Sequence, residues 1–218
     1  MDLPSSPSTP PAPTSKLAVS SFALGLLGFC TGVSAPFGLI LGVLAHRKIS
    51  QSEGRMKGSG LATSGIIASC LALGFMLLVL PAVIKAKELA DQINCVNNLS
   101  YLRRSIEGYA ANHEGRFPQA TNWCDVMEPY VGSNNFFMCP AKSKLRCGYA
   151  YNSNLSGKVR NEVDAQTVML FESDGGWNFS GGSAQMVTNR HHGTVVSTVD
   201  GSVRWVQSSE LGTLRWNP

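Results

Sequence analysis

Residues 61–113 constrain the fold more than any other part of the chain, because they join an apolar half and an amphipathic half without interruption. Residues 61–83 contain no charged side chain. At about 1.5 Å per residue, a helix of this length crosses a hydrocarbon core of about 30 Å. No Gly or Pro lies between Ala82 and Tyr101, and only Pro81 is a candidate for a kink. The sequence therefore predicts a transmembrane helix that continues into water.

After Lys85 the apolar residues are reduced to a stripe whose members lie three or four positions apart, as they do on one face of a helix. This spacing predicts an amphipathic stem helix over residues 85–113, which packs on a domain formed by residues 114–218. The stripe consists of Leu89, Ile93, Val96, Leu99, Leu102, Ile106 and Tyr109.

A second apolar segment, residues 17–45, contains five glycines and is broken near Pro36. We expect a retained, bent membrane helix whose glycines allow close approach to the second span, so that residues 16–84 form a two-span module. A signal peptide cleaved after Ala35 and a re-entrant bend at Pro36 are the alternatives. Residues 1–15 contain five prolines and are expected to form a disordered tail.

The connection between the two apolar segments is basic. Residues 46–60 contain Arg47, Lys48, Arg55 and Lys57 against a single acidic residue. Positive charge between two spans is retained in the cytoplasm. The sequence therefore predicts that this connection faces the cytoplasm and that residues 85–218 lie outside it.

Charge and motifs limit the possible functions of the extramembrane part. The chain has a net charge of +4, but from Lys85 onward thirteen Lys and Arg residues stand against twelve Asp and Glu residues. This balance argues against a nucleic-acid-binding face and leaves the lipid bilayer as the expected partner of the apolar segments. No G-x-S-x-G, H-E-x-x-H or phosphate-binding loop is present, so we expect neither an enzyme nor a small-molecule substrate.

Four of the six cysteines follow the membrane segments, and an even number in a small extracytoplasmic domain indicates two disulfides. The sequence permits three connectivities. We expect Cys139 to pair with Cys147 or Cys124, and Cys95 to tie the stem helix to the loop region. Zinc is a weaker alternative, because no C-x2-C pair is present.

The clearest local signal in residues 114–218 is a β-hairpin at Asp200-Gly201. A two-residue turn with positive φ at both positions would place Val199 opposite Ser202. Two alternating runs flank the turn, and their more apolar face is then expected to cover the stem helix. That face comprises Val196, Thr198, Val203 and Trp205. The predicted fold class is α+β, with a transmembrane helical hairpin whose second helix continues as a stem packed on a small antiparallel sheet.

A short helix over residues 123–130 is also expected, capped by Asn122 and ended near Gly132. Residues 136–139, 148–152 and 167–171 are short β-prone runs bounded by Gly, Pro and Asn.

Two polar regions are candidate metal sites. Imidazole and carboxylate ligands could come from Asp174, His191, His192 and Asp200, although Asp200 is also explained by the hairpin turn. The oxygen-rich residues 172–178 could bind calcium, but they lack the full spacing of a calcium-binding helix–loop–helix motif. We expect no catalytic residue, and calcium is the one cofactor to be weighed.

The stem resembles that of type IV pilins and pseudopilins. The resemblance is carried by residues 80–88, 94–99 (Asn-Cys-Val-Asn-Asn-Leu) and 109–118 (Tyr-Ala-Ala-Asn-His-Glu-Gly-Arg-Phe-Pro). Their order is similar to that in prepilin-like proteins of planctomycete and verrucomicrobial type with a His-x9-Asp-Gly signature. Here His191 and Asp200 are separated by eight residues, and residues 61–83 contain no Glu and no processing site.

Residues 16–84 resemble a bacterial two-span membrane module classed as a domain of unknown function (DUF4190-like). The matching segments are residues 17–28, 36–42, 46–49 and 57–62. Together, the two resemblances imply a noncatalytic, pilin-like protein of the bacterial inner membrane. It would act in cell-envelope assembly, type II secretion-like export or interaction with other envelope proteins. The alternative is a membrane-tethered sensor or binding domain for an envelope ligand or calcium.

Overall fold

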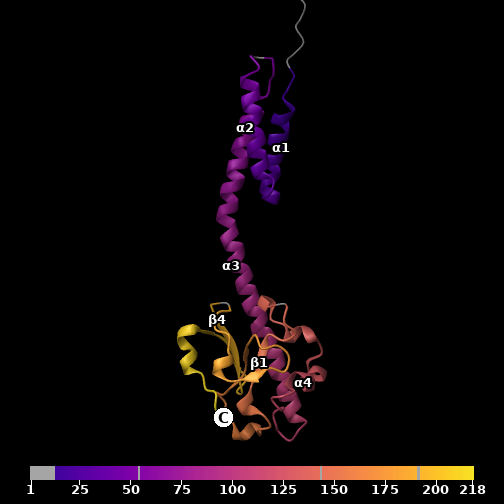
Figure 1. Ribbon diagram of the computed structural model, residues 1–218, viewed down its shortest axis with the longest axis vertical. Coiled ribbons are helices and arrows are strands. Elements are labelled where there is room, and N and C mark those ends of the chain that lie inside the picture. The colour runs from indigo at the N-terminus through magenta and orange to yellow at the C-terminus, as the bar shows by residue number, and fades with distance from the viewer. Residues whose placement is uncertain (1–12, 54, 143, 191) are drawn as a thin grey trace, which may run out of the picture. The chain divides into compact units, whose positions relative to one another are not determined.

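The computed structural model describes residues 13–53, 55–142, 144–190 and 192–218, and the chain divides into two compact units, residues 1–84 and 85–218 (Figure 1). Most of the predicted disordered tail lies outside the described residues. The described end of that segment is ordered. The backbone N–H of Ser15 donates to the carbonyl of Lys57 at 3.0 Å, and that of Lys57 donates to the carbonyl of Pro13 at 3.1 Å.

Helices α1 (Lys16–Thr31) and α2 (Ala35–Ser50) replace the single bent helix that was predicted for residues 17–45. The chain reverses between them at Gly32, whose φ of 66° favours glycine. The two helices pack closely through small residues, since a Cβ atom on Gly38 would lie 2.8 Å from the backbone nitrogen of Gly25. The predicted break near Pro36 is therefore a helical hairpin, with the turn at residues 32–34 and Pro36 in the first turn of α2.

Helix α3 (Ser59–Ala111) is continuous through Pro81 and includes the whole predicted stem apart from its last two residues. Among the described residues, it is the one helix long and apolar enough to cross a membrane. Large apolar side chains in its first half are exposed, with Leu77 at 75% and Leu78 at 77%. The helix ends where the backbone N–H of Gly115 donates to the carbonyl of Ala110 at 2.8 Å, which satisfies one of the terminal carbonyl groups.

Residues 85–218 form an α+β unit around a five-stranded sheet, which confirms the predicted fold class. The strands are β1 (Tyr149–Asn152), β2 (Val168–Glu172), β3 (Ser180–Gly181), β4 (Gly193–Thr198) and β5 (Val203–Gln207), in the order β3-β1-β2-β4-β5. All pairings are antiparallel except the short one between β1 and β3.

A short helix, α4 (Trp123–Val131), lies beside the sheet and ends at Gly132, close to the predicted bounds. The predicted cap Asn122 makes no side-chain hydrogen bond to it. Of the β-prone runs, residues 148–152 and 167–171 supply β1 and β2, whereas residues 134–137 form a 3-10 helix.

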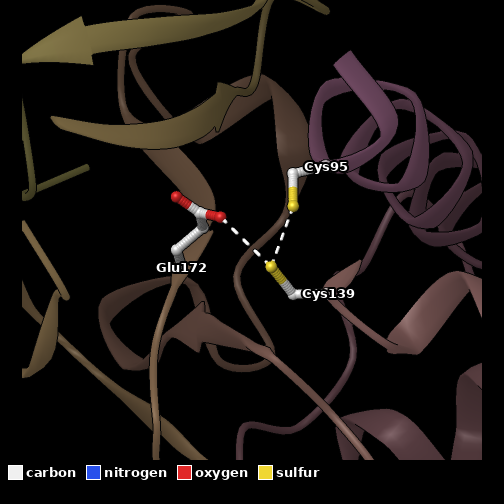
Figure 2. Close-up of side chains that lie close together, drawn as sticks. All are labelled: Cys95, Cys139 and Glu172. Atoms are coloured by element: carbon white, nitrogen blue, oxygen red, sulfur yellow. Dashed lines mark hydrogen bonds between the residues drawn. The ribbon is translucent and has the colours of Figure 1, made fainter. Parts of the chain in front are cut away.

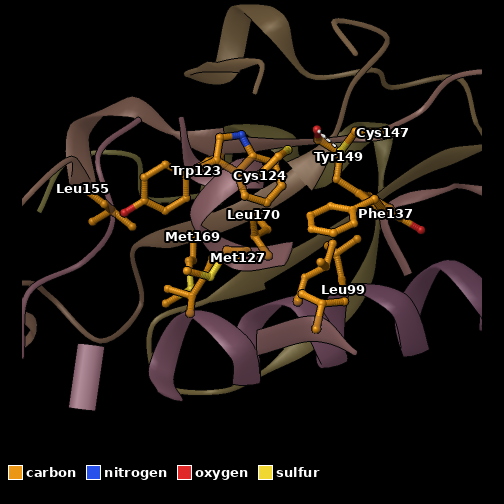
Figure 3. Packing of buried hydrophobic residues seen from close by; sticks show 14 of the residues in the cluster. Leu99, Trp123, Cys124, Met127, Phe137, Cys147, Tyr149, Leu155, Met169 and Leu170 are labelled. Atoms are coloured by element: carbon orange, nitrogen blue, oxygen red, sulfur yellow. Dashed lines mark hydrogen bonds between the residues drawn. The ribbon is translucent and has the colours of Figure 1, made fainter. Parts of the chain in front are cut away.

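The main core lies between α3 and one face of the sheet (Figure 3). Leu99, Leu102 and Ile106 of the predicted stripe are fully buried, and Val96 and Tyr109 pack at its edge. Leu89 and Ile93 are more than half exposed, at 56% and 51%, because the core begins only at Cys95. The largest fully buried partners are Trp123, Tyr149, Tyr151, Phe117 and Phe137.

The hairpin between β4 and β5 differs from the prediction by one residue. Ser197 pairs with Val203 and Val196 with Arg204, so that Thr198 and Ser202 flank a three-residue loop. Only Gly201 in this loop has a positive φ, of 106°. A slip of one residue moves every side chain of a strand to the other face. Val196 consequently lies in a second cluster on the far face of the sheet, whereas Val203 and Trp205 pack against the α3 core.

The second cluster covers the other face of the sheet and is smaller. The segment around Trp216 closes it, since the side chain of Asn152 donates to the carbonyl oxygens of Val168 and Trp216 at 2.7 and 2.9 Å. Its buried members are Ala150, Val168, Phe171, Val196, Val206 and Leu214.

Candidate functional site

The structure does not bring the predicted metal ligands together within its described residues. Asp174 forms an ion pair with Arg190, and Asp200 accepts hydrogen bonds from Gln166, Thr198 and the backbone of Ser202. His192 is exposed, and its Nε2 atom lies 3.9 Å from a carboxylate oxygen of Glu88. His191 lies outside the described residues.

The predicted calcium-binding loop is also engaged by other side chains. Trp177 Nε1 donates to Asp125 Oδ1 at 2.7 Å, and Asn178 Nδ2 donates to Asp125 Oδ2 at 2.5 Å. Asn178 Oδ1 accepts from the backbone N–H groups of Cys124 and Asp125 at the start of α4. Residues 177 and 178 therefore hold α4 in place, and their polar atoms are turned toward that helix.

A different group of potential ligands is found deep in the same unit. Cys95 comes from α3, Cys139 from the segment before β1, and Glu172 from the end of β2 (Figure 2). All three are fully buried. The two sulfur atoms lie 2.9 Å apart, and Cys139 Sγ lies 3.6 Å from Glu172 Oε1. Among the described residues, this is the one group of three or more such side chains with mutually close ligand atoms.

The carboxylate of Glu172 is held by fixed donors. The backbone N–H of Val195 donates to Oε2 at 2.9 Å, and the buried guanidinium of Arg190 lies 3.9 Å from Oε1. Arg190 is itself fixed by bonds of 2.9 Å to the carbonyl oxygens of Gly148 and Ser173. A buried charge is costly unless it is paired and hydrogen-bonded, and these contacts meet that requirement.

The two thiols of this cluster differ in acidity. The hydrogen bond that Cys95 donates to Cys139, together with burial, raises the pKa of Cys95 far above its usual range. The same hydrogen bond lowers the pKa of Cys139, and the positive charge of Arg190 acts in the same direction. Cys139 is therefore the better nucleophile of the pair, because the thiolate is the reactive form of cysteine.

Cys124 and Cys147 form a second pair in the main core (Figure 3). Burial, followed by the hydrogen bond between the two thiols, raises the pKa of Cys124 above its usual range. Cys147 Sγ also lies 3.2 Å from the carbonyl oxygen of Tyr149. The expected pairing of Cys139 with Cys147 or Cys124 is wrong, because Cys139 lies against Cys95. The described cysteines are free thiols, so the predicted disulfides are not formed in this structure.

The geometry of the first pair suits sulfur chemistry better than zinc. Two thiolates on a tetrahedral zinc ion, each bonded at about 2.3 Å, stand about 3.8 Å apart. Cys95 and Cys139 are closer, at 2.9 Å. A cation would also have to compete with Arg190 and with the Val195 amide for the oxygen atoms of Glu172. The arrangement is that of two neighbouring thiols, and not that of two thiolates around a zinc ion.

One feature of the sequence indicates a buried polar site at this position. Glu172 is the only charged residue in the apolar run Val168–Glu172, and a charge in a buried strand requires a partner. Nothing in the sequence identified Arg190 as that partner, because it comes from a segment without regular secondary structure.

Comparison with known proteins identifies one region of the chain. Residues 17–79 match a family model described as "Domain of unknown function (DUF4190)". No curated protein matches the chain. No solved structure matches it either. The family match supports the similarity of this region to a membrane module of unknown function. It does not support the resemblance of the stem to pilins and prepilin-like proteins.

Proposed function

We propose that this chain is a noncatalytic membrane-anchored protein that presents residues 85–218 outside the cytoplasm as an assembly or interaction element of the bacterial envelope. One observation carries the proposal: helix α3 (Ser59–Ala111) is continuous, apolar and exposed in its first half, and part of a folded core in its second half. A single helix with these two halves connects an anchor to the unit that it displays.

The helical hairpin supports the anchoring role. Each of its helices has 16 residues, which corresponds to about 24 Å at 1.5 Å per residue. Small residues allow it to pack against the first half of α3, since a Cβ atom on Gly65 would lie 2.9 Å from the backbone nitrogen of Phe22. Close contact through small residues is typical of helices in membranes. The anchor would therefore be a hairpin packed against one full span, in the inner membrane.

The basic residues of the connection between α2 and α3 support the orientation. Arg47 and Lys48 lie in the last turn of α2, and Lys57 lies just before α3. The hydrogen bonds between Ser15, Lys57 and Pro13 place the start of α1 beside this basic connection. By the positive-inside rule, the start of α1 and the basic connection would face the cytoplasm, and α3 would run from there to the outside.

The exposed apolar part of the stem supports an interaction role. Leu89 and Ile93 follow the expected span and lie outside the core of their own unit. In an assembly built from pilin-like stems, a neighbouring chain would cover such residues. The absence of a Glu in the apolar half means that a contact of this kind, and not a buried acidic group, would have to hold the chains together.

Topology reporters and site-specific crosslinking test the two parts of the proposal. Reporters fused after residue 54 and after Pro218 are expected to lie on opposite sides of the membrane, with the carboxyl terminus outside. A photoreactive side chain at Ile93 is expected to give intermolecular adducts, while one at the exposed Glu210 serves as the control. A cytoplasmic carboxyl terminus would refute the orientation. Equal adducts at the two positions would refute the stem as the contact surface.

A further inference from the structure

We infer that the four core cysteines are a modification site, in which Cys95 is oxidised to a disulfide with Cys139 and Cys124 to one with Cys147. The two bonds would fasten α3 and α4 to the segment that enters β1. Oxidation in the cell rests on the extracytoplasmic placement proposed above, because the cytoplasm keeps thiols reduced.

The first pair is not at disulfide distance, which is about 2.05 Å, but its sulfur atoms are in direct contact. The sulfur atoms of Cys95 and Cys139 lie 2.9 Å apart, which is shorter than the van der Waals contact distance of two sulfur atoms that are not bonded. Both side chains are fully buried, so neither is available to a second protein chain in the folded state. Oxidation would remove the hydrogen bond that the Cys139 thiol donates to Glu172 Oε1 at 3.6 Å. Glu172 would keep the bond from the backbone N–H of Val195 to Oε2 and the nearby charge of Arg190, which is itself held by two carbonyl oxygens.

The second pair is independent of the first and shares its main features. Cys124 is the second residue of α4, and Cys147 lies two residues before β1. Both are fully buried members of the main core, where Cys147 Sγ donates to the carbonyl oxygen of Tyr149 at 3.2 Å and Cys124 Sγ accepts from the backbone N–H of Asn178 at 3.2 Å. Pairing of Cys95 with Cys139 leaves Cys124 and Cys147 as the other two core cysteines, which selects one of the three connectivities that four cysteines allow.

The two pairs hold opposite ends of one segment. Cys139 and Cys147 bound a stretch whose described residues form no strand or α-helix. Its ends are brought together by the bond from the backbone N–H of Gly148 to the carbonyl of Phe137 at 2.8 Å. Gly148 packs directly on Cys139, since a Cβ atom there would lie 2.6 Å from Cys139 Cβ. Oxidation would join one end of this segment to α3 and the other to α4.

The chemistry balances with a disulfide-bearing thiol oxidoreductase as the oxidant. During folding, the thiolate of Cys139 attacks one sulfur of the oxidant disulfide and releases the other as a thiolate, which gives a mixed disulfide. Cys95 loses its proton to solvent, and its thiolate attacks Cys139 Sγ. The bond to the oxidant breaks, and the oxidant leaves as a dithiol. Two electrons pass from the cysteines to the oxidant, and the second pair reacts in the same way.

The test maps disulfides in the purified full-length chain. The protein is unfolded and reduced, refolded in detergent with oxidised glutathione, alkylated under denaturing conditions and digested without reductant for mass spectrometry. We expect crosslinked peptides joining Cys95 to Cys139 and Cys124 to Cys147, with Cys70 alkylated as an internal control. A peptide joining Cys139 to Cys147, or full alkylation of the four core cysteines, would overturn the inference. Zinc that is retained after dialysis and released when the thiols are alkylated would also overturn it.

A second arm separates this inference from the proposed orientation. Cells are quenched with acid, and the thiols are alkylated before lysis, so that the redox state in the cell is preserved. Oxidised pairs in these samples support both proposals. If the purified protein forms the two expected bonds but the cellular protein has only thiols, the sulfur pairing stands and the extracytoplasmic orientation fails.

Discussion

Asn178 caps helix α4 from a distant part of the chain, since its Oδ1 atom accepts a hydrogen bond from the backbone N–H of Cys124, 54 positions earlier, at 2.8 Å. The adjacent residue Asn122, which the sequence favours as the cap, makes no such bond. The loop after β2 therefore determines where α4 begins, and it places Cys124 in the core beside Cys147.

Replacing this distant cap should destabilise the domain. Asn178 has a φ of 57°, which glycine also adopts, so Asn178→Gly removes the cap without adding backbone strain. We expect a loss of about 1 kcal/mol in the free energy of unfolding, as for other helix caps. The matched control Asn122→Ala should change it by less than about 0.5 kcal/mol. Denaturant unfolding of the full chain in detergent measures both changes in free energy. Equal losses in the two variants would show that Asn178 is not the cap of α4.

The buried guanidinium of Arg190 should contribute far more than a surface ion pair. In Arg190→Met, Glu172 stays buried without its positive partner, and two carbonyl oxygens lose their donors. We expect a loss of about 3–5 kcal/mol in the free energy of unfolding. In the control Arg215→Met, the lost pair with Asp164 is exposed, and about 1 kcal/mol or less should be lost. Comparable losses in the two variants, measured by denaturant unfolding, would contradict this account.

The hairpin turn should make stability depend on acid pH. Hydrogen bonds from Thr198 and from the backbone of Ser202 lower the pKa of Asp200. A carboxyl group with a lowered folded-state pKa stabilises the fold above its unfolded pKa, which is about 3.9, and this contribution is lost as the pH falls through the lower folded value.

The matched variant for this effect is Asp200→Asn, which keeps the side-chain oxygen as an acceptor and removes the charge. We expect its free energy of unfolding to fall less steeply than that of the wild type when the pH is lowered from about 5 to below 4. Denaturant unfolding at a series of pH values gives the two slopes. Identical slopes would show that Asp200 does not contribute to the acid sensitivity.

The two cysteines of the first pair should behave differently when one is removed. Because the pKa of Cys139 is lowered and that of Cys95 is raised, Cys139 is the expected attacking thiolate. Cys95→Ser should therefore accumulate a mixed disulfide when it refolds with oxidised glutathione, since no second thiol resolves it. Cys139→Ser should accumulate much less at Cys95. Intact mass and peptide mapping measure the adduct, and the reverse asymmetry would contradict the assignment of roles.

Closing the first pair should also stabilise the fold. The two cysteines are 44 positions apart, and a crosslink that closes a loop of this length restricts the unfolded chain by about 4 kcal/mol in the chain-entropy model. On reduction, the oxidised wild type should lose this much free energy of unfolding in addition to any contribution of the second pair. The double variant Cys95→Ser, Cys139→Ser isolates the second pair. No change on reduction in either protein would contradict a structural role for the bonds.

The elements that sequence alone could predict are those with a strong local period or a long apolar run. Helix α3 ends at Ala111, two residues before the predicted end, because its stripe of Leu99, Leu102 and Ile106 repeats at helical spacing almost up to the Gly115 turn. The hairpin was also predictable, but its register was not. Asp-Gly fits both a two-residue and a three-residue loop, and the bond from the Ser202 backbone to Asp200 belongs to the loop that forms.

The candidate site lay beyond such signals because it depends on contacts between distant segments. Cys95, Cys139 and Glu172 come from a helix, a loop and a strand, and no spacing in the sequence relates them. The predicted ligand set failed for the opposite reason. Asp174 and Asp200 are close to other polar residues in sequence, but Asp174 pairs with Arg190, 16 positions away, and Asp200 accepts bonds within its own turn.

Gly148 illustrates how a residue with no reactive group can decide the behaviour of those that have one. Its hydrogen atom faces Cys139 Cβ at a distance that leaves no room for a methyl group. Any larger residue would push Cys139 out of line with Cys95 while leaving both thiols chemically intact. Substitution scanning should therefore find that Gly148 tolerates replacement as poorly as the cysteines do. Variants designed to keep the two sulfur atoms in contact would have to retain this glycine.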